Sequence, residues 1–232
     1  MFGPLQHFED VPCNGTFLAV DCWPLNVAWT FFLRQYFFER GGVAIRAEPG
    51  DHVIDAGACF GDTALAFAAS VGVSGRVYAF ETLDTHLEII RHNLRQNPRF
   101  ANVIDVFPFG LGDTSNPDAK PIGTDGDLAP GFTLHGVDDE DLLPVRTVDD
   151  LVWSGDIEGY ELKALHGAKE TIHRFKPKLA VSIYHRPQEM YEIPAFLADL
   201  GVGYAFYLEH YTIHREETVL YAVSRSRSSA EG

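Results

Sequence analysis

Residues 52–69, HVIDAGACFGDTALAFAA, constrain the fold more than any other stretch of this 232-residue chain. The apolar run at 52–56 is typical of a buried strand, and the run at 62–71 resumes with helical spacing. Gly57 and Gly61 stand between them, where a sharp turn from strand to helix needs residues that tolerate positive φ. A strand, a glycine turn and a helix together indicate one unit of a parallel α/β sheet.

The same alternation continues towards the C-terminus, which predicts an α/β fold built on a doubly wound, mostly parallel, Rossmann-like sheet. Two runs near the end are joined by a connection too short for a parallel crossover, so they should form an antiparallel pair at the sheet edge. The predicted strands are 52–56, 76–81, 102–109, 178–184, 204–210 and 217–224, and the predicted helices are 62–71, 84–97, 159–175 and 189–201.

We divide the chain into an N-terminal extension at 1–42, a domain at 43–225 and a tail at 226–232. Residues 26–40 of the extension are predicted to form an amphipathic helix that is capped by Asn26 and stopped by Gly41-Gly42. Its many aromatic residues either pack the helix on the domain or make it a lid over a substrate pocket. We favour packing, the more common role of such a face.

A long segment rich in Gly, Pro and Asp, residues 113–145, interrupts the alternation. A loop of this length in a compact domain is typically an active-site flap or a mobile surface excursion, and we favour the second. The following TVDD has the form of a capping box with Thr147 at the cap, which predicts a short helix at 147–153.

Composition excludes some classes of partner. The chain has 33 acidic and 18 basic residues and a net charge of −15, and thirteen of the acids lie between Asp113 and Glu161. Nucleic acids and anionic membranes are bound largely through clustered Lys and Arg, so we expect neither partner. Three cysteines without a CxxC pair, and an N-terminus without a signal-peptide pattern, predict a cytoplasmic protein.

Two acids at strand ends indicate the kind of ligand. Asp55 lies within the glycine turn, where a carboxylate would repel a diphosphate but would accept hydrogen bonds from an ammonium group. Glu81 ends the next strand, a position suited to binding ribose hydroxyls. S-adenosylmethionine, an adenosine compound with a cationic tail, matches this pattern. The alternative, an NAD-type oxidoreductase, is less favoured because GACFG lacks the GxGxxG pattern.

The segments DAGACFGDTAL, AFE, DIEGYEL, ALHGAKETI and PKLAVSIYHRP resemble the FkbM family of S-adenosylmethionine-dependent methyltransferases, over about residues 43–224. The resemblance implies a class I methyltransferase fold and, for most members, O-methylation of hydroxyls on natural products and sugars. It implies that the turn after the first strand lines the methionine end, that Glu81 binds the ribose, and that 110–113 lies near the adenine. The expected cofactor-binding residues are Asp55, Ala56, Gly57, Ala58, Gly61, Asp62, Thr63, Glu81, Thr82, Gly110, Leu111 and Asp156.

The sequence departs from the family pattern immediately before DIEG at 156–159. Members carry an apolar strand of about six residues there, whereas LVWSG leads directly into the motif. Either Leu151–Trp153 gives up its predicted helix to form a short strand, or the sequence lacks residues that the complete chain contains between Gly155 and Asp156. We favour the second interpretation, because an unpaired gap in a parallel sheet would leave backbone groups unsatisfied in the core.

Methyl transfer to a hydroxyl needs alignment and a group that takes the proton. His185, just after the predicted strand 178–184, is the first candidate for the general base, although a histidine here is as often a backbone cap. Asp156 is the second, as a base or as the group that orients one. Weaker candidates are His135 and His210, and Tyr184 and Arg186 are candidate residues of the acceptor pocket.

Asp156 and Glu158 would suit a divalent ion, but spacing identifies no third ligand, so no metal site is assigned. The expected partner is a small-molecule acceptor with a hydroxyl; the sequence specifies neither its identity nor the oligomeric state. A domain that binds the cofactor without turnover, as a scaffold, is the remaining alternative.

Overall fold

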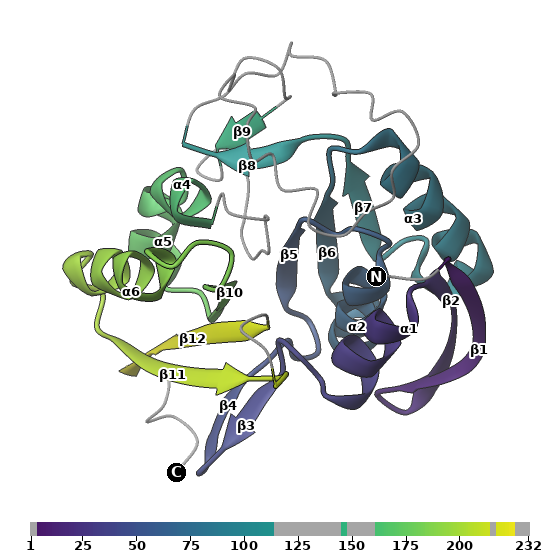
Figure 1. The fold of residues 1–232 in the computed structure, drawn as a ribbon, viewed down its shortest axis with the longest axis horizontal. Helices are drawn as coiled ribbons and strands as arrows, with labels where there is room; N and C mark the ends of the chain where they lie inside the picture. The colour runs from purple at the N-terminus through teal and green to yellow at the C-terminus, as the bar shows by residue number, and fades with distance from the viewer. Residues whose placement is uncertain (1–3, 114–144, 148–160, 214–216, 226–232) are drawn as a thin grey trace.

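The structure is a computed structural model that describes residues 4–113, 145–147, 161–213 and 217–225 (Figure 1). Its first half is a parallel sheet in the order β5-β6-β7, with His52 opposite Arg76 and Val77 opposite Ile104. The elements of this half are β5 His52–Ala56, α2 Asp62–Val71, η2 Gly72–Ser74, β6 Arg76–Phe80, α3 Asp84–Gln96, η3 Pro98–Phe100 and β7 Ile104–Phe107. They agree closely with the predicted boundaries, except that the strand predicted at 102–109 is shorter.

Alternation along β6 explains why helices cover the sheet on both faces. Val77 and Ala79 belong to the core cluster that α2 and α3 complete, whereas Phe80 belongs to a second cluster formed with α4, α5 and α6. Side chains of a strand point to opposite faces in turn, so an almost wholly apolar strand requires cover on both. The predicted doubly wound α/β class is confirmed.

The C-terminal half is a second sheet in the order β10-β12-β11, and both of its pairings are antiparallel. This confirms the predicted antiparallel pair at the edge. The elements are α4 Glu161–His166, α5 Lys169–Phe175, β10 Leu179–Ser182, α6 Glu189–Asp199, β11 Tyr204–His210 and β12 Thr218–Ser224.

The single helix predicted at 159–175 is wrong, because it divides into α4 and α5 around Gly167. A Cβ on Gly167 would lie 2.0 Å from the carbonyl oxygen of Gly112. The helix therefore breaks where its backbone comes against β8, Gly110–Gly112, and glycine is the residue that allows this approach.

The two sheets share a core without a hydrogen-bonded strand between them among the described residues. Ile54 and Ala56 of β5 pack in one cluster with Val181 of β10 and Leu220 of β12. Residues 148–160, which hold the junction between Gly155 and Asp156, lie outside the described residues. Both interpretations of the short family strand therefore remain predictions.

Thr147, the predicted cap, ends the strand β9, Val145–Thr147. This strand runs parallel to β8, with Gly112 opposite Thr147. A cap residue has extended backbone, so this placement is compatible with a helix that begins after Thr147. The residues of that helix, like most of the 113–145 segment, lie outside the described residues, so the helix remains a prediction.

The N-terminal extension contains less helix than predicted. Its elements are β1 Gln6–Cys13, β2 Thr16–Cys22, α1 Pro24–Asn26, the π-helix η1 Val27–Phe32 and β3 Phe38–Arg40, and β3 pairs with β4 Val43–Ile45 at the start of the domain. The helix predicted at 26–40 ends at Phe32, and positive φ at Arg34 (56°) and Tyr36 (73°) turns the chain into the β3–β4 hairpin. Gly41 and Gly42, also at positive φ, form the hairpin turn and do not stop a helix.

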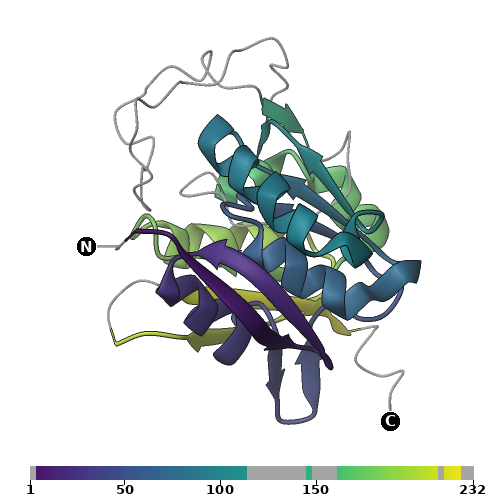
Figure 2. The same ribbon diagram turned by 90° about the vertical axis from the view of Figure 1, so that its right-hand side faces the viewer.

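Most aromatic residues of the extension pack on the domain. Trp23 meets Phe60 edge-on, with ring centroids 4.4 Å apart, and Phe37 stacks on Phe67 at 5.6 Å. The β1–β2 hairpin lies over α2 and α3, which Figure 2 shows from the side. The extension thus joins the core cluster of the parallel half, while Phe32 remains 67% exposed.

Within the described parts of the chain, no helix has the length and apolar character needed to cross a membrane. The three cysteines are all free thiols, and Cys22 is buried.

Candidate functional site

The turn after β5 has the backbone geometry that its glycines predict. Gly57 and Gly61 have φ of 79° and 78°, and Cys59 between them has φ of 48°. The N–H groups of Gly57 and Ala58 both donate to the carbonyl oxygen of Phe80, which ties the turn to the end of β6. Gly61 then precedes α2, and a Cβ there would lie 3.3 Å from Ile90. The turn is thus fixed against the two neighbouring elements.

Asp55 is buried at the bottom of this turn and is only 5% exposed. Burial, with a smaller contribution from the nearby acids Asp62 and Glu81, raises the pKa of its carboxyl to about 7, although a 2.7 Å hydrogen bond from the Thr63 hydroxyl opposes the shift. A cationic group beside this buried carboxyl would stabilise its ionised form, because a nearby positive charge lowers the pKa of an acid.

The hydrogen-bond partners of Asp62 come from the N-terminal extension. Its carboxylate accepts a 2.6 Å hydrogen bond from the Thr30 hydroxyl and a 3.3 Å hydrogen bond from the Asn26 amide. Burial raises the pKa of Asp62 as well. The first residue of α2 therefore anchors the N-terminal extension to the turn.

Glu81 is buried just after β6 and uses both of its oxygens. Oε1 accepts the backbone N–H groups of Thr82 (2.7 Å) and Leu83 (2.9 Å), and Oε2 accepts that of Cys59 (2.9 Å). Nδ1 of His86 lies 3.3 Å from Oε2. These contacts occupy the approximately four acceptor positions of a carboxylate and link the ends of β5, β6 and α3.

The remaining predicted cofactor residues divide by the direction of their side chains. A Cβ on Gly110 would lie 3.3 Å from Thr82, so β8 adjoins the residues that follow β6. The side chains of Ala56, Ala58 and Leu111 are buried in the core, which leaves only their backbones to face a ligand. Asp156, Glu158 and His135 lie outside the described residues.

His185 lies in the loop after β10, beside a residue that the sequence analysis did not single out. Nδ1 of His185 is 2.7 Å from Oε1 of Glu161, the first residue of α4. Both side chains are buried, at 6% and 0% exposed, and the ring of Tyr184 lies 4.1 Å from the imidazole. When Glu161 is ionised, Nδ1 carries the proton and donates it, which places the imidazole lone pair on Nε2.

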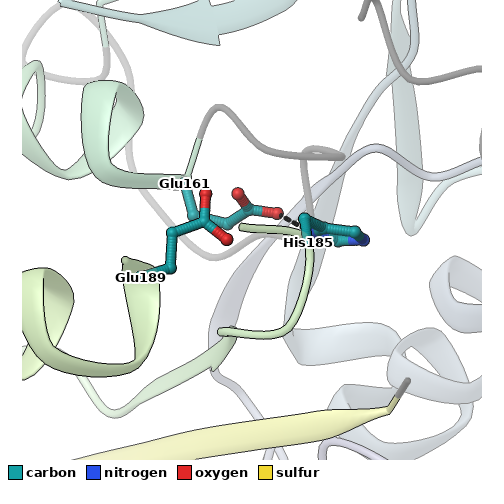
Figure 3. A group of neighbouring side chains, drawn as sticks. All are labelled: Glu161, His185 and Glu189. Carbon is teal, nitrogen blue, oxygen red and sulfur yellow. Dashed lines mark hydrogen bonds and ion pairs between the residues drawn. The ribbon is translucent and has the colours of Figure 1, made fainter. Parts of the chain in front are cut away.

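Glu189, the first residue of α6, completes the cluster and was also missed. Glu161, His185 and Glu189 each offer one ligand atom, and these atoms all lie within 4.8 Å of one another (Figure 3). Burial and the adjacent Glu161 carboxyl raise the pKa of Glu189 to about 7, while the Arg186 N–H donates to it at 2.9 Å. A histidine followed four residues later by an acid at a helix start was the available signal.

A short segment of the extension connects the turn with the surroundings of His185. Thr30 binds Asp62 at one end, and at the other Gln35 donates to Glu217, which also accepts the hydroxyl of Tyr184. Five residues span at most about 18 Å of backbone. The backbone positions that bind Asp62 and Glu217 therefore lie no further apart than this. The weaker candidate His210 is exposed at the end of β11 and contacts Thr218, and Arg186 is exposed.

A glycine turn after the first strand of a doubly wound sheet, with an acid at the end of the next strand, is the arrangement of a methyltransferase of Rossmann-like class I fold. The family model described as "Methyltransferase FkbM domain" matches residues 55–204, so the chain belongs to the FkbM methyltransferase family. This is a family of S-adenosylmethionine-dependent methyltransferases, and the predicted family membership is confirmed.

The solved structures that resemble this chain include one FkbM methyltransferase. Methyltransferase FkbM from Methylobacillus flagellatus KT is 28% identical with a TM-score of 0.63, and the match covers 82% of this chain and 48% of that one, so this chain spans about half its length. A putative rRNA-methylase from Clostridium thermocellum is 13% identical (77% and 88% covered, TM-score 0.49). Aeropyrum pernix fibrillarin, solved with natively bound S-adenosyl-L-methionine, is 14% identical (76% and 68% covered, TM-score 0.45). No curated protein sequence matches the chain.

Proposed function

We propose that the chain transfers the methyl group of S-adenosylmethionine to a hydroxyl on a small molecule. Membership of the FkbM family supports methyl transfer. The observation that supports a hydroxyl acceptor is the buried hydrogen bond between His185 and Glu161, because a hydroxyl is a weak nucleophile until a base takes its proton.

The cofactor is proposed to lie in the turn after β5. Asp55 accepts a hydrogen bond from the cationic methionine end, which favours the ionised carboxylate. The ribose hydroxyls bind Glu81 by displacing its most distant partner, His86 at 3.3 Å. Gly110 and Thr82 border the adenine, and the backbones of Ala56, Ala58 and Leu111 contribute N–H and C=O groups only.

In this proposal His185 is the general base and Glu161 is its positioning residue. Glu161 holds the ring by accepting the Nδ1 proton, so that Nε2 takes the proton of the acceptor hydroxyl. Asp156 remains a second candidate in the proposal, as an orienting group near the transferred methyl.

The test combines binding with turnover. Calorimetry with S-adenosylhomocysteine measures the cofactor site, and a radiolabelled methyl group supplied on S-adenosylmethionine measures transfer to a panel of sugars, phenols and other hydroxylated acceptors. We expect His185→Ala to lower kcat by about 10²- to 10⁴-fold with unchanged S-adenosylhomocysteine affinity, and His210→Ala to change neither.

Other outcomes would support the alternatives. Binding of S-adenosylhomocysteine with no transfer to any acceptor, and no effect of His185→Ala, would indicate a scaffold. Binding of NADH in place of S-adenosylhomocysteine would indicate an oxidoreductase.

A further inference from the structure

Two segments of the chain, at residue 161 and at residues 185–189, bring a mixed set of ligand groups together. Glu161 opens α4, Glu189 opens α6, and His185 lies in the loop between β10 and α6 (Figure 3). Their carboxylate oxygens and one ring nitrogen all lie within 4.8 Å of one another. Ligands about 2.1 Å from one metal ion lie about 3 to 3.5 Å apart when adjacent, so small side-chain rotations close the set around an ion.

The charge of the cluster favours a cation. The side chain of Glu161 is 0% and that of His185 6% exposed, and Glu189 is 2% exposed. When both carboxylates are ionised beside a neutral imidazole, the cluster carries a charge of −2 that is largely removed from water, which is costly unless a proton or an opposite charge is near. The N-terminus of α6 offers a partial positive charge of about half an elementary charge. A divalent cation would balance the cluster.

We propose that Glu161, His185 and Glu189 bind one divalent metal ion. Imidazole suits Zn²⁺ and other late first-row ions, and carboxylates suit Mn²⁺ and Mg²⁺. A set of one imidazole and two carboxylates therefore favours Mn²⁺ and Zn²⁺ over Mg²⁺. Three protein ligands leave positions for water or for an oxygen of a substrate.

The consequence for catalysis rests on the proposed function. A divalent ion at this place lowers the pKa of a hydroxyl that it contacts, which supplies the deprotonation assigned above to His185. The two roles exclude each other, because an imidazole bound to a metal has no lone pair left to accept a proton. Transfer to a hydroxyl holds in both cases.

The experiment is a titration of the full, metal-stripped chain with Mn²⁺, followed by electron paramagnetic resonance of the free ion. We expect saturable binding of one Mn²⁺ per chain, displaced by Zn²⁺. Glu189→Gln and Glu161→Gln should each weaken this binding by at least about tenfold. Glu192→Gln, an exposed acid on the same helix, should leave it unchanged and is the matched control.

The control matters because a chain of net charge −15 attracts cations in many places. The absence of a saturable site, or Mn²⁺ binding that Glu189→Gln and Glu161→Gln leave as strong as in the wild type, would overturn the proposal. S-adenosylhomocysteine affinity, measured on each variant, verifies that the fold is intact.

Failure of the metal site and failure of the proposed function are distinguishable. One saturable Mn²⁺ without methylation of any hydroxylated acceptor would leave the metal site standing and refute the function. Methylation that persists in EDTA, in a chain without saturable Mn²⁺ binding, would refute the metal site and leave the function standing. His185 would then be the group that takes the proton of the hydroxyl.

Discussion

Glu81 and Glu189 are both buried acids that belong to the candidate site, yet the groups around them differ. Glu81 accepts three backbone N–H groups, which the fold places at fixed positions at the ends of β5 and β6. Glu189 accepts one backbone N–H and lies against a second carboxyl, that of Glu161, and against His185. Glu81 is therefore satisfied by dipoles of the chain, whereas the Glu161–His185–Glu189 cluster needs a proton or a cation from outside.

The comparison is tested first by Glu81→Gln, which should have the largest effect. An amide places N–H donors where one oxygen now accepts from the backbone, so at least one buried charge-assisted hydrogen bond is lost. We expect a loss of about 2–4 kcal/mol in the free energy of unfolding. Calorimetry should show a fall in Tm of roughly 4–15 °C for a domain of this size. An unchanged Tm would mean that the hydrogen bonds from the three backbone N–H groups do not depend on the negative charge of Glu81.

The pH dependence of cofactor binding probes the same side of the site. Because the pKa of Asp55 is raised to about 7, the free protein binds a proton there below pH 7, and a ligand whose ammonium group contacts Asp55 must displace it. Affinity for S-adenosylhomocysteine should be constant above pH 7 and fall by roughly tenfold per unit below it.

Calorimetry in two buffers with different ionisation enthalpies measures the released proton directly. We expect release of nearly one proton at pH 6 and almost none at pH 8. Asp55→Asn should flatten both profiles, and a wild-type affinity that is independent of pH would show that Asp55 does not face the cationic end.

A substitution at Gly61 tests whether the cost of a side chain there comes from the backbone conformation or from steric contact with a neighbour. Gly61 and Gly203 share a φ of 78°, but a Cβ on Gly61 would lie 3.3 Å from Ile90, while one on Gly203 would meet nothing within 4 Å. Gly61→Ala should cost about 1–2 kcal/mol in stability from the left-handed backbone alone, with an added cost from Ile90. Gly203→Ala, the control with the same φ, should cost only the first part, and equal shifts in Tm would exclude a role for Ile90.

Sequence predicted the strand, turn and helix at 52–71 well because their determinants are local. The strand at 52–56, the glycines of the turn and the helix at 62–71 follow one another directly, and the structure reproduces both boundaries. Glu81 was found because it ends the adjacent strand. What the sequence did not reveal is that Asp62 binds Thr30 in the extension, a contact across 32 residues that no local pattern encodes.

The Glu161–His185–Glu189 cluster could be predicted only in part. His185 was found from its place at a strand end, but Glu161 and Glu189 join it through the packing of α4 and α6, which periodicity does not specify. The same limit explains the wrong prediction at Gly167, where contact with β8 from a distant part of the chain decided the local conformation.

Glu189→Gln should have the smallest effect and the opposite sign to Glu81→Gln. Burial and Glu161 raise the folded-state pKa of Glu189 from 4.5 to about 7, so the wild type loses stability as the pH rises from about 4.5 to 7. The amide keeps an oxygen for the Arg186 N–H and offers a donor to Glu161. In EDTA we expect a gain of about 1 kcal/mol at pH 8, which disappears near pH 4.5. Thermal unfolding at both pH values, with Glu192→Gln as the control, measures this gain. A Tm of Glu189→Gln below that of the wild type at pH 8 would show that the carboxyl groups of Glu161 and Glu189 do not repel each other.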